Sequence, residues 1–167
     1  MKFIAFITVC TILTGVGTFT NHWIISDEGM GISLYPWGKS GANEFFQTRP
    51  EWWKCVIVTM LLGFSLELLT LVLYAFISIY RYHHHPVVYI MQLVASSLIA
   101  LCLSIGVLVW VSCYTKIEYN VDIIAADVSP GYSWGVLLIA AIVALTVVGN
   151  SMYDLFKVRH NFHDEHF

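Results

Sequence analysis

Charged residues are scarce in this sequence, with 8 Lys and Arg and 11 Asp and Glu among 167 residues. Hydrophobic residues make up 58% of the chain, and its mean hydropathy is +0.74. A water-soluble globule cannot bury so large an apolar fraction, so the composition predicts an integral membrane protein. The few basic residues form no cluster, which argues against nucleic acid as a partner.

Cysteine is rare as well, and all four cysteines fall inside or at the ends of apolar runs. This placement excludes the disulfide framework of a small secreted domain. Cys55 and Cys113 would lie near the same membrane face, so a bridge between them is conceivable, but isolated thiols at helix ends more often serve as small apolar residues. The other two cysteines are Cys10 and Cys102.

The motifs of common catalytic sites are also missing. The sequence has no Cys-x-x-Cys pair, no nucleophilic serine elbow and no glycine-rich phosphate loop, so we expect neither an enzyme nor a bound cofactor. His160, His163 and Asp164 have a spacing that could bring them together around zinc. A solvated tail explains the same residues, so we expect no metal site.

Long apolar runs supply most of the chain and predict its architecture. About 20 mainly apolar residues cross a hydrocarbon core, and four stretches meet this requirement, at residues 3–20, 53–80, 87–113 and 132–156. The runs are continuously apolar, whereas barrel strands alternate, so the sequence predicts an all-α transmembrane fold. Residues 1–167 then form a single four-span domain.

The first run also has features of a secretory signal peptide, since Lys2 precedes an apolar core. The apolar character continues to Ile25, however, and no small-x-small cleavage site is evident. We therefore expect this run to be retained as a helix.

Four helices place both termini on one side of the membrane and the two long connections, residues 21–52 and 114–131, on the other. Lys and Arg are equally numerous on the two sides, but the terminal-side segments are much shorter. Their higher density of positive charge predicts cytoplasmic termini and extracellular connections.

The first connection is the longest segment that cannot lie in a bilayer, so we expect contacts with other molecules to begin there. Residues 21–26 and 31–37 read as two short strands joined by a glycine-rich, acidic turn. The connection contains no cysteine, so its fold must depend on aromatic side chains. The chief ones are Trp23, Tyr35 and Trp37.

A tandem of tryptophans, Trp52 and Trp53, marks the start of the second apolar run. Amphipathic tryptophan rings are enriched at membrane interfaces, so we expect both rings at headgroup depth.

Glu67 is the one acidic residue deep in a predicted span, and Thr59 and Thr70 fall on the same helical face. Intramembrane carboxylates suggest an ion path or a proton relay. With no second charge at that depth, we favour an uncharged carboxyl that packs against hydroxyls of neighbouring helices. The candidate partners are Thr8, Thr11 and Ser104, and Asn150 is a further intramembrane polar residue.

Small residues recur at four-residue spacing in the third and fourth runs, where they would allow close helix approach. Packing within one chain explains them as well as a dimer interface does, and we favour the former. They are Ser96, Ala100 and Ser104 in one run and Ala140 and Ala144 in the other.

Several segments resemble the superfamily of peripheral myelin protein, the epithelial membrane proteins, claudins and the gamma subunits of calcium channels. The most specific are Thr20–Ile24 at the start of the first connection, Glu51–Met60 entering the second run, and Tyr132–Gly135 opening the fourth. The segment Gly31–Tyr35, which includes Leu34, stands where this superfamily shows its Gly-Leu-Trp signature, with Tyr35 replacing tryptophan. The two loop cysteines of the superfamily would fall near Gly38 and Glu44, so this chain cannot form that disulfide.

The resemblance implies a left-handed four-helix bundle with a small extracellular antiparallel β-sheet in the plasma membrane. It implies a non-enzymatic role in cell contact or membrane organisation, with membrane lipid and itself or another membrane protein as partners. The alternative within the superfamily is an auxiliary, gamma-like subunit of an ion channel. A small four-helix membrane enzyme is the rival class, but it needs several charged residues at one depth and this sequence offers one.

Overall fold

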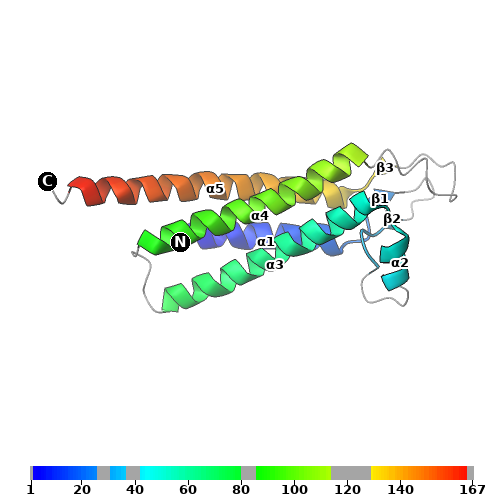
Figure 1. Ribbon diagram of the computed structural model, residues 1–167, viewed down its shortest axis with the longest axis horizontal. Helices are drawn as coiled ribbons and strands as arrows, with labels where there is room; N and C mark the ends of the chain where they lie inside the picture. The colour runs from blue at the N-terminus through cyan, green and yellow to red at the C-terminus, as the bar shows by residue number, and fades with distance from the viewer. Residues whose placement is uncertain (1, 26–30, 37–41, 80–85, 114–128, 165–167) are drawn as a thin grey trace.

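Four long helices pack side by side in the computed structural model, which describes residues 2–25, 31–36, 42–79, 86–113 and 129–164 (Figure 1). The third helix of the bundle, α4, packs against both of the helices α3 and α5, while α1 packs against α5 and, less extensively, α3. A short helix, α2, lies beside the strands at one end, and α1 begins and α5 ends at the other (Figure 1). The helices are α1 (Lys2–Phe19), α2 (Ala42–Thr48), α3 (Glu51–Ile79), α4 (Pro86–Cys113) and α5 (Tyr132–Asp164).

The outer surface of the bundle is apolar. Three helices are long and apolar enough to cross a membrane, over Glu51–Ile79, Val87–Cys113 and Tyr132–Val158, and Phe3–Phe19 forms a shorter apolar helix. Each long helix leaves large aliphatic side chains more than half exposed, which is costly in water and favourable in lipid. Examples are Ile12, Leu69, Leu108 and Leu145. The chain is therefore a membrane protein.

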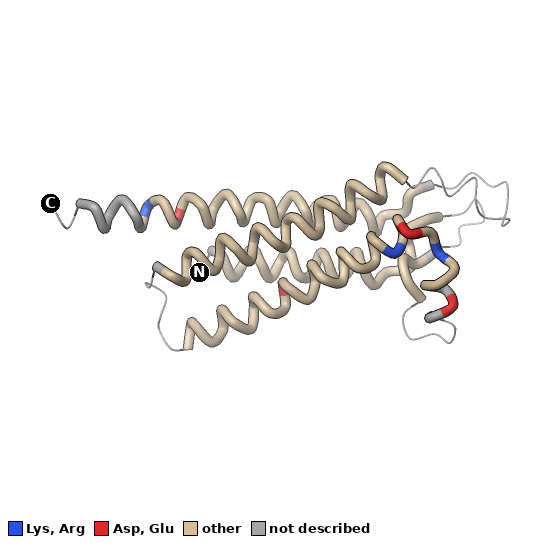
Figure 2. The backbone as a smooth tube through the Cα atoms, in the orientation of Figure 1, with Lys and Arg blue, Asp and Glu red and all other residues tan. Residues whose placement is uncertain are grey.

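Charged side chains in the described part of the chain gather near the two ends of the bundle (Figure 2). Between these two groups, Glu67 is the single acidic or basic residue that the structure describes. The group beside the sheet consists of Glu44, Arg49, Glu51 and Lys54, and the group near the end of α5 consists of Asp154 and Lys157.

Three strands of two residues form a small antiparallel sheet in the order β2-β1-β3. Ile24 in β1 (Ile24–Ile25) pairs with Ile32 in β2 (Gly31–Ile32) on one side and with Pro130 in β3 (Ser129–Pro130) on the other. The sheet therefore joins both long connections between helices, although they are about 100 residues apart along the chain.

The strands differ from the sequence expectation, which placed two longer strands at residues 21–26 and 31–37. The chain leaves the sheet after Ile32 because Leu34 turns inward and is fully buried. The third strand comes from the second connection, where two residues carry too little periodicity to predict a strand. Trp37 lies outside the described residues.

Backbone amides at the start of α5 are satisfied by the first connection. The Gly131 amide donates to the Trp23 carbonyl at 2.9 Å, and the Ser133 amide donates to the His22 carbonyl at 3.2 Å. The first amides of a helix have no partner within the helix, so these bonds stabilise its start. They also fix the first connection against α5.

The helices end at different positions from those expected. The last helix continues to Asp164 rather than to residue 156, and α2 was not predicted. The side chains of His160, His163 and Asp164 lie outside the described residues, so the zinc hypothesis is not tested. All four cysteines are free thiols, so the bridge considered for Cys55 and Cys113 is absent.

Four of the five small residues in the third and fourth runs lie inside the bundle, and Ser104 is half-buried. Ala140, Ala144, Ser96 and Ala100 are all buried, at 3% exposure or less. Their burial supports packing within one chain, as favoured from the sequence. The left-handed twist expected for the bundle stays a prediction.

Gly131 generates a first prediction, because a Cβ atom at this position would overlap the backbone carbonyl of His22. Gly131→Ala must break the bonds that hold the first connection to α5, and we expect it to lower the free energy of unfolding by about 2 kcal/mol or more. A Cβ atom added at Gly135 would meet nothing within 4 Å, so Gly135→Ala is a matched control with little effect. Thermal unfolding in detergent would compare the two, and equal stabilities would contradict this account.

Candidate functional site

Three tryptophans meet where the sheet joins the helices, and we call Trp23, Trp53 and Trp110 the tryptophan cluster. Each side chain is only 1% exposed. The Trp110 ring lies edge-on to Trp23 at 4.8 Å between centroids and edge-on to Trp53 at 5.3 Å. Such pairs are favourable beyond the area they bury. The cluster therefore joins the first connection, the start of α3 and the end of α4.

Two indole N–H groups of the cluster bond backbone carbonyls. Trp23 Nε1 donates to the Gly17 carbonyl at 2.9 Å, and Trp53 Nε1 donates to the Leu34 carbonyl at 2.8 Å. Gly17 lies in the last turn of α1, where carbonyls lack partners within the helix. Trp23 therefore caps α1, and Trp53 satisfies the carbonyl of a buried loop residue.

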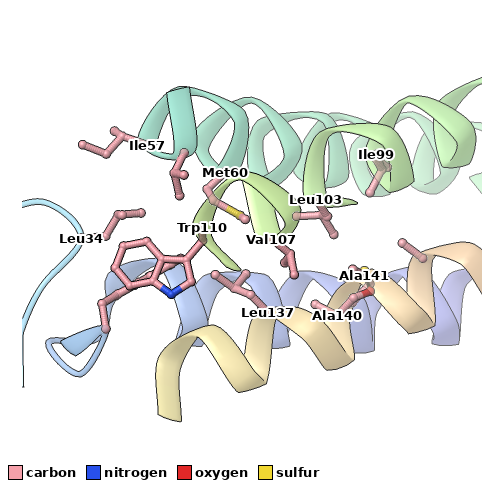
Figure 3. Close-up of a cluster of buried hydrophobic side chains, with 14 of the residues drawn as sticks. Leu34, Ile57, Met60, Ile99, Leu103, Val107, Trp110, Leu137, Ala140 and Ala141 are labelled. Carbon is pink, nitrogen blue, oxygen red and sulfur yellow. Dashed lines mark hydrogen bonds between the residues drawn. The ribbon is translucent and has the colours of Figure 1, made fainter. Parts of the chain in front are cut away.

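Leu34 is fully buried, and its side chain lies beside Trp110, close to the helices (Figure 3). Its neighbour Tyr35 is half-buried and faces Phe46 of α2, with ring centroids 6.5 Å apart. The residues singled out in the first connection therefore have two roles: Trp23 and Leu34 are buried in the core, whereas Tyr35 packs against α2.

Sequence reasoning placed the tandem tryptophans at headgroup depth, and this depth stays a prediction, but the burial of Trp53 was not anticipated. Its ring is buried in the core, while Trp52 is half-buried and lies 5.5 Å from it between centroids. The signal was present in the helical spacing, because Trp53, Val56 and Met60 share the buried face of α3.

Arg49 covers the cluster from the polar side. Its guanidinium carbon lies 5.0 Å from the centroid of Trp53, a cation–π geometry. Burial lowers the pKa of Arg49, since a half-buried guanidinium is less well solvated. The aromatic face offsets part of that cost.

A second candidate site surrounds Glu67 in the middle of α3, where the carboxyl is fully buried. Thr14 Oγ1 donates to Glu67 Oε1 at 2.9 Å, and Cys10 Sγ donates to the same oxygen at 3.1 Å. Cys10 Sγ also lies 3.4 Å from the carbonyl of Ala140. The group therefore links α3 to α1 and reaches α5.

Thr8 and Thr11 were expected to bond Glu67, and this prediction is wrong. Their hydroxyls donate to carbonyls of their own helix, Ile4 and Ile7, at 2.7 and 2.8 Å. The rotation of α1 about its axis, which the sequence does not reveal, presents Cys10 and Thr14 instead.

The other predicted intramembrane polar residues do not converge on Glu67. Thr59 and Thr70 donate to carbonyls one turn earlier in α3, those of Cys55 and Leu66, at 2.8 and 2.7 Å. Asn150 is exposed and lines a cavity between α1 and α5. An ion path needs a continuous row of polar groups, and the described residues do not form one around Glu67.

No group of three His, Cys, Asp or Glu side chains in the described part of the chain is placed to hold a metal ion. Glu67 Oε2 is buried and has no hydrogen-bond partner among the described residues. The bonds of Oε1 to Thr14 and Cys10 suit this group to linking helices.

Glu67 generates a second prediction. Glu67→Gln keeps an oxygen for Thr14 and Cys10, so we expect near-normal stability and surface delivery. Glu67→Leu removes two interhelical bonds, each worth roughly 0.6 kcal/mol, and should destabilise the bundle by about 1 kcal/mol. Thr14→Val removes one of the same bonds, so its effect should be smaller and should vanish in the Glu67→Leu background.

Unfolding in detergent and surface labelling of cells provide the measurements. Loss of a partner's ion current in Glu67→Gln, with the protein folded at the surface, would show that ionisation of Glu67 is functional. The helix-linking interpretation would then be wrong.

Comparison with known proteins yields one family match. The family model described as "Tight junction protein, Claudin-like" matches residues 1–160. A search of curated proteins finds no match. The matched region includes the tryptophan cluster and both connections that form the sheet, and it confirms the resemblance seen in the sequence. This chain belongs to the claudin-like family.

Proposed function

We propose that this protein is a non-enzymatic, four-span protein of the plasma membrane that mediates cell contact through its sheet-bearing end. The termini would be cytoplasmic and the sheet extracellular, as charge density suggests. The shorter α1 has 18 residues, about 27 Å at roughly 1.5 Å per residue, which is close to the hydrocarbon thickness of a bilayer. Its length therefore supports a fourth span.

The observation that carries this proposal is the attachment of the sheet to the bundle. Strands from both long connections pair with each other, and the tryptophan cluster fixes them against α3 and α4. A surface held in one shape pays little ordering entropy when it binds a partner. Contact between cells is a function that uses such a surface.

An auxiliary role in an ion channel is the second candidate. The sequence suggested it through a lateral polar face around Glu67. That support is weakened, because Glu67 and Thr70 are buried inside the bundle. The enzyme alternative is weaker still, since Glu67 is the one described acidic or basic residue at its depth.

The third prediction tests the contact role. Cells that express the protein with a fluorescent C-terminal tag are mixed with cells that lack it. If the protein contacts a second copy of itself, the tag should gather at borders between two expressing cells and stay uniform at mixed borders. Enrichment at both kinds of border would indicate a different receptor on the neighbouring cell and still support a contact role.

The control is the Gly135→Ala variant, which should behave as the wild type because its added methyl meets nothing. A uniform distribution at every border, together with a channel subunit that co-purifies in stoichiometric amount, would contradict the contact role. The auxiliary role would then be the better account.

A further inference from the structure

A cavity of 150 Å³ opens between α1 and α5 at the end of the bundle far from the sheet. Part of its lining is apolar and includes Phe3, Phe6 and Val147. The rest of its lining is polar and includes Asn150, Ser151 and Asp154. The cavity is too small for a peptide segment, and its place at the rim of the apolar surface suggests a lipid.

Val147, Asn150, Ser151 and Asp154 follow one another along α5. Asp154 comes seven residues after Val147, a rise of about 10 Å at roughly 1.5 Å per residue. The headgroup region on one side of a bilayer is roughly 5 to 8 Å thick. The rise is therefore enough to pass from hydrocarbon into the headgroups. Apolar, hydrogen-bonding and anionic groups therefore appear in the order in which a phospholipid presents its acyl chain, its phosphate and its terminal amine.

Ser151 supplies an independent observation. The residue is only 2% exposed, and its hydroxyl has no hydrogen-bond partner among the described residues. A buried hydroxyl without a partner is costly. The phosphate or ester oxygens of a lipid in this cavity would be suitable acceptors for it and for the Asn150 amide.

We propose that this cavity binds a phospholipid with a primary-amine headgroup of the phosphatidylethanolamine type. Phe3, Phe6 and Val147 contact the start of the acyl chain, while Asn150 and Ser151 donate to the phosphate region. The Asp154 carboxylate accepts a charge-assisted hydrogen bond from the ammonium group.

The charge of Asp154 selects among lipids. A choline headgroup has no N–H to donate, so it forgoes this hydrogen bond. A serine headgroup brings a carboxylate that Asp154 repels, and a glycerol headgroup has no cation. This site is independent of the proposed contact role, because it lies at the other end of the bundle.

The fourth prediction is a lipid preference, measured by native mass spectrometry of the full-length protein in detergent with added phosphatidylethanolamine, phosphatidylcholine, phosphatidylserine or phosphatidylglycerol. We expect phosphatidylethanolamine adducts to be retained in excess. Asp154→Asn should reduce that excess roughly two- to fivefold, the range of one exposed ion pair. Glu51→Gln, the same change of charge beside the sheet, is the matched control and should have no effect.

Ser151→Ala should weaken retention of every phospholipid, since it removes a donor that all of them use. Equal retention of phosphatidylcholine and phosphatidylethanolamine by the wild type would contradict the proposal, as would an Asp154→Asn variant with an unchanged preference. A preference for phosphatidylserine or phosphatidylglycerol would also overturn it and would point to Lys157 as the recognising charge. If Asp154→Asn fails to fold, the preference of the wild type and the effect of Ser151→Ala decide the matter.

Discussion

Burial of the tryptophan cluster is the interaction on which the structure depends. The sheet has two residues in each strand, which is too little to be stable alone. It exists because Trp23 and Leu34 extend from it into the core, where Trp53 and Trp110 pack on them. The sheet and the helices therefore share one core, and the shape of the outward surface follows from the packing of the bundle.

Local satisfaction of polar groups is the second constraint. Buried backbone carbonyls cannot reach water, so their partners must come from the chain. Indole N–H groups supply them at Gly17 and Leu34. The buried carboxyl of Glu67 is likewise bonded by the chain itself, since the thiol and hydroxyl groups of α1 donate hydrogen bonds to it. A disulfide in the first connection is unnecessary where side chains of the bundle already fix it.

The four long helices and the family could be predicted from the sequence, because continuous apolar runs and the Trp23 and Leu34 segments are local signals. Which side chains and strands contact one another could not be predicted. Trp53 is read as an interfacial ring because tryptophan near a helix start is typical of membrane interfaces. Its spacing with Val56 and Met60 indicates a buried face of α3, but its contact with Trp110 of α4 is not evident from the sequence. The choice of Thr14 over Thr11 depends on the rotation of α1, and pairing of β3 with β1 depends on contacts far apart in sequence.

The coupling between Trp23 and Trp110 tests the shared core most directly. Unfolding free energies in detergent would be measured for Trp23→Leu, Trp110→Leu and the double variant. Each single change should cost about 2 kcal/mol or more, and the double variant should be less destabilised than the sum by about 1 kcal/mol, because the edge-to-face contact is lost only once. Additivity within about 0.3 kcal/mol would show that the sheet and the bundle are energetically independent, and it would contradict this account.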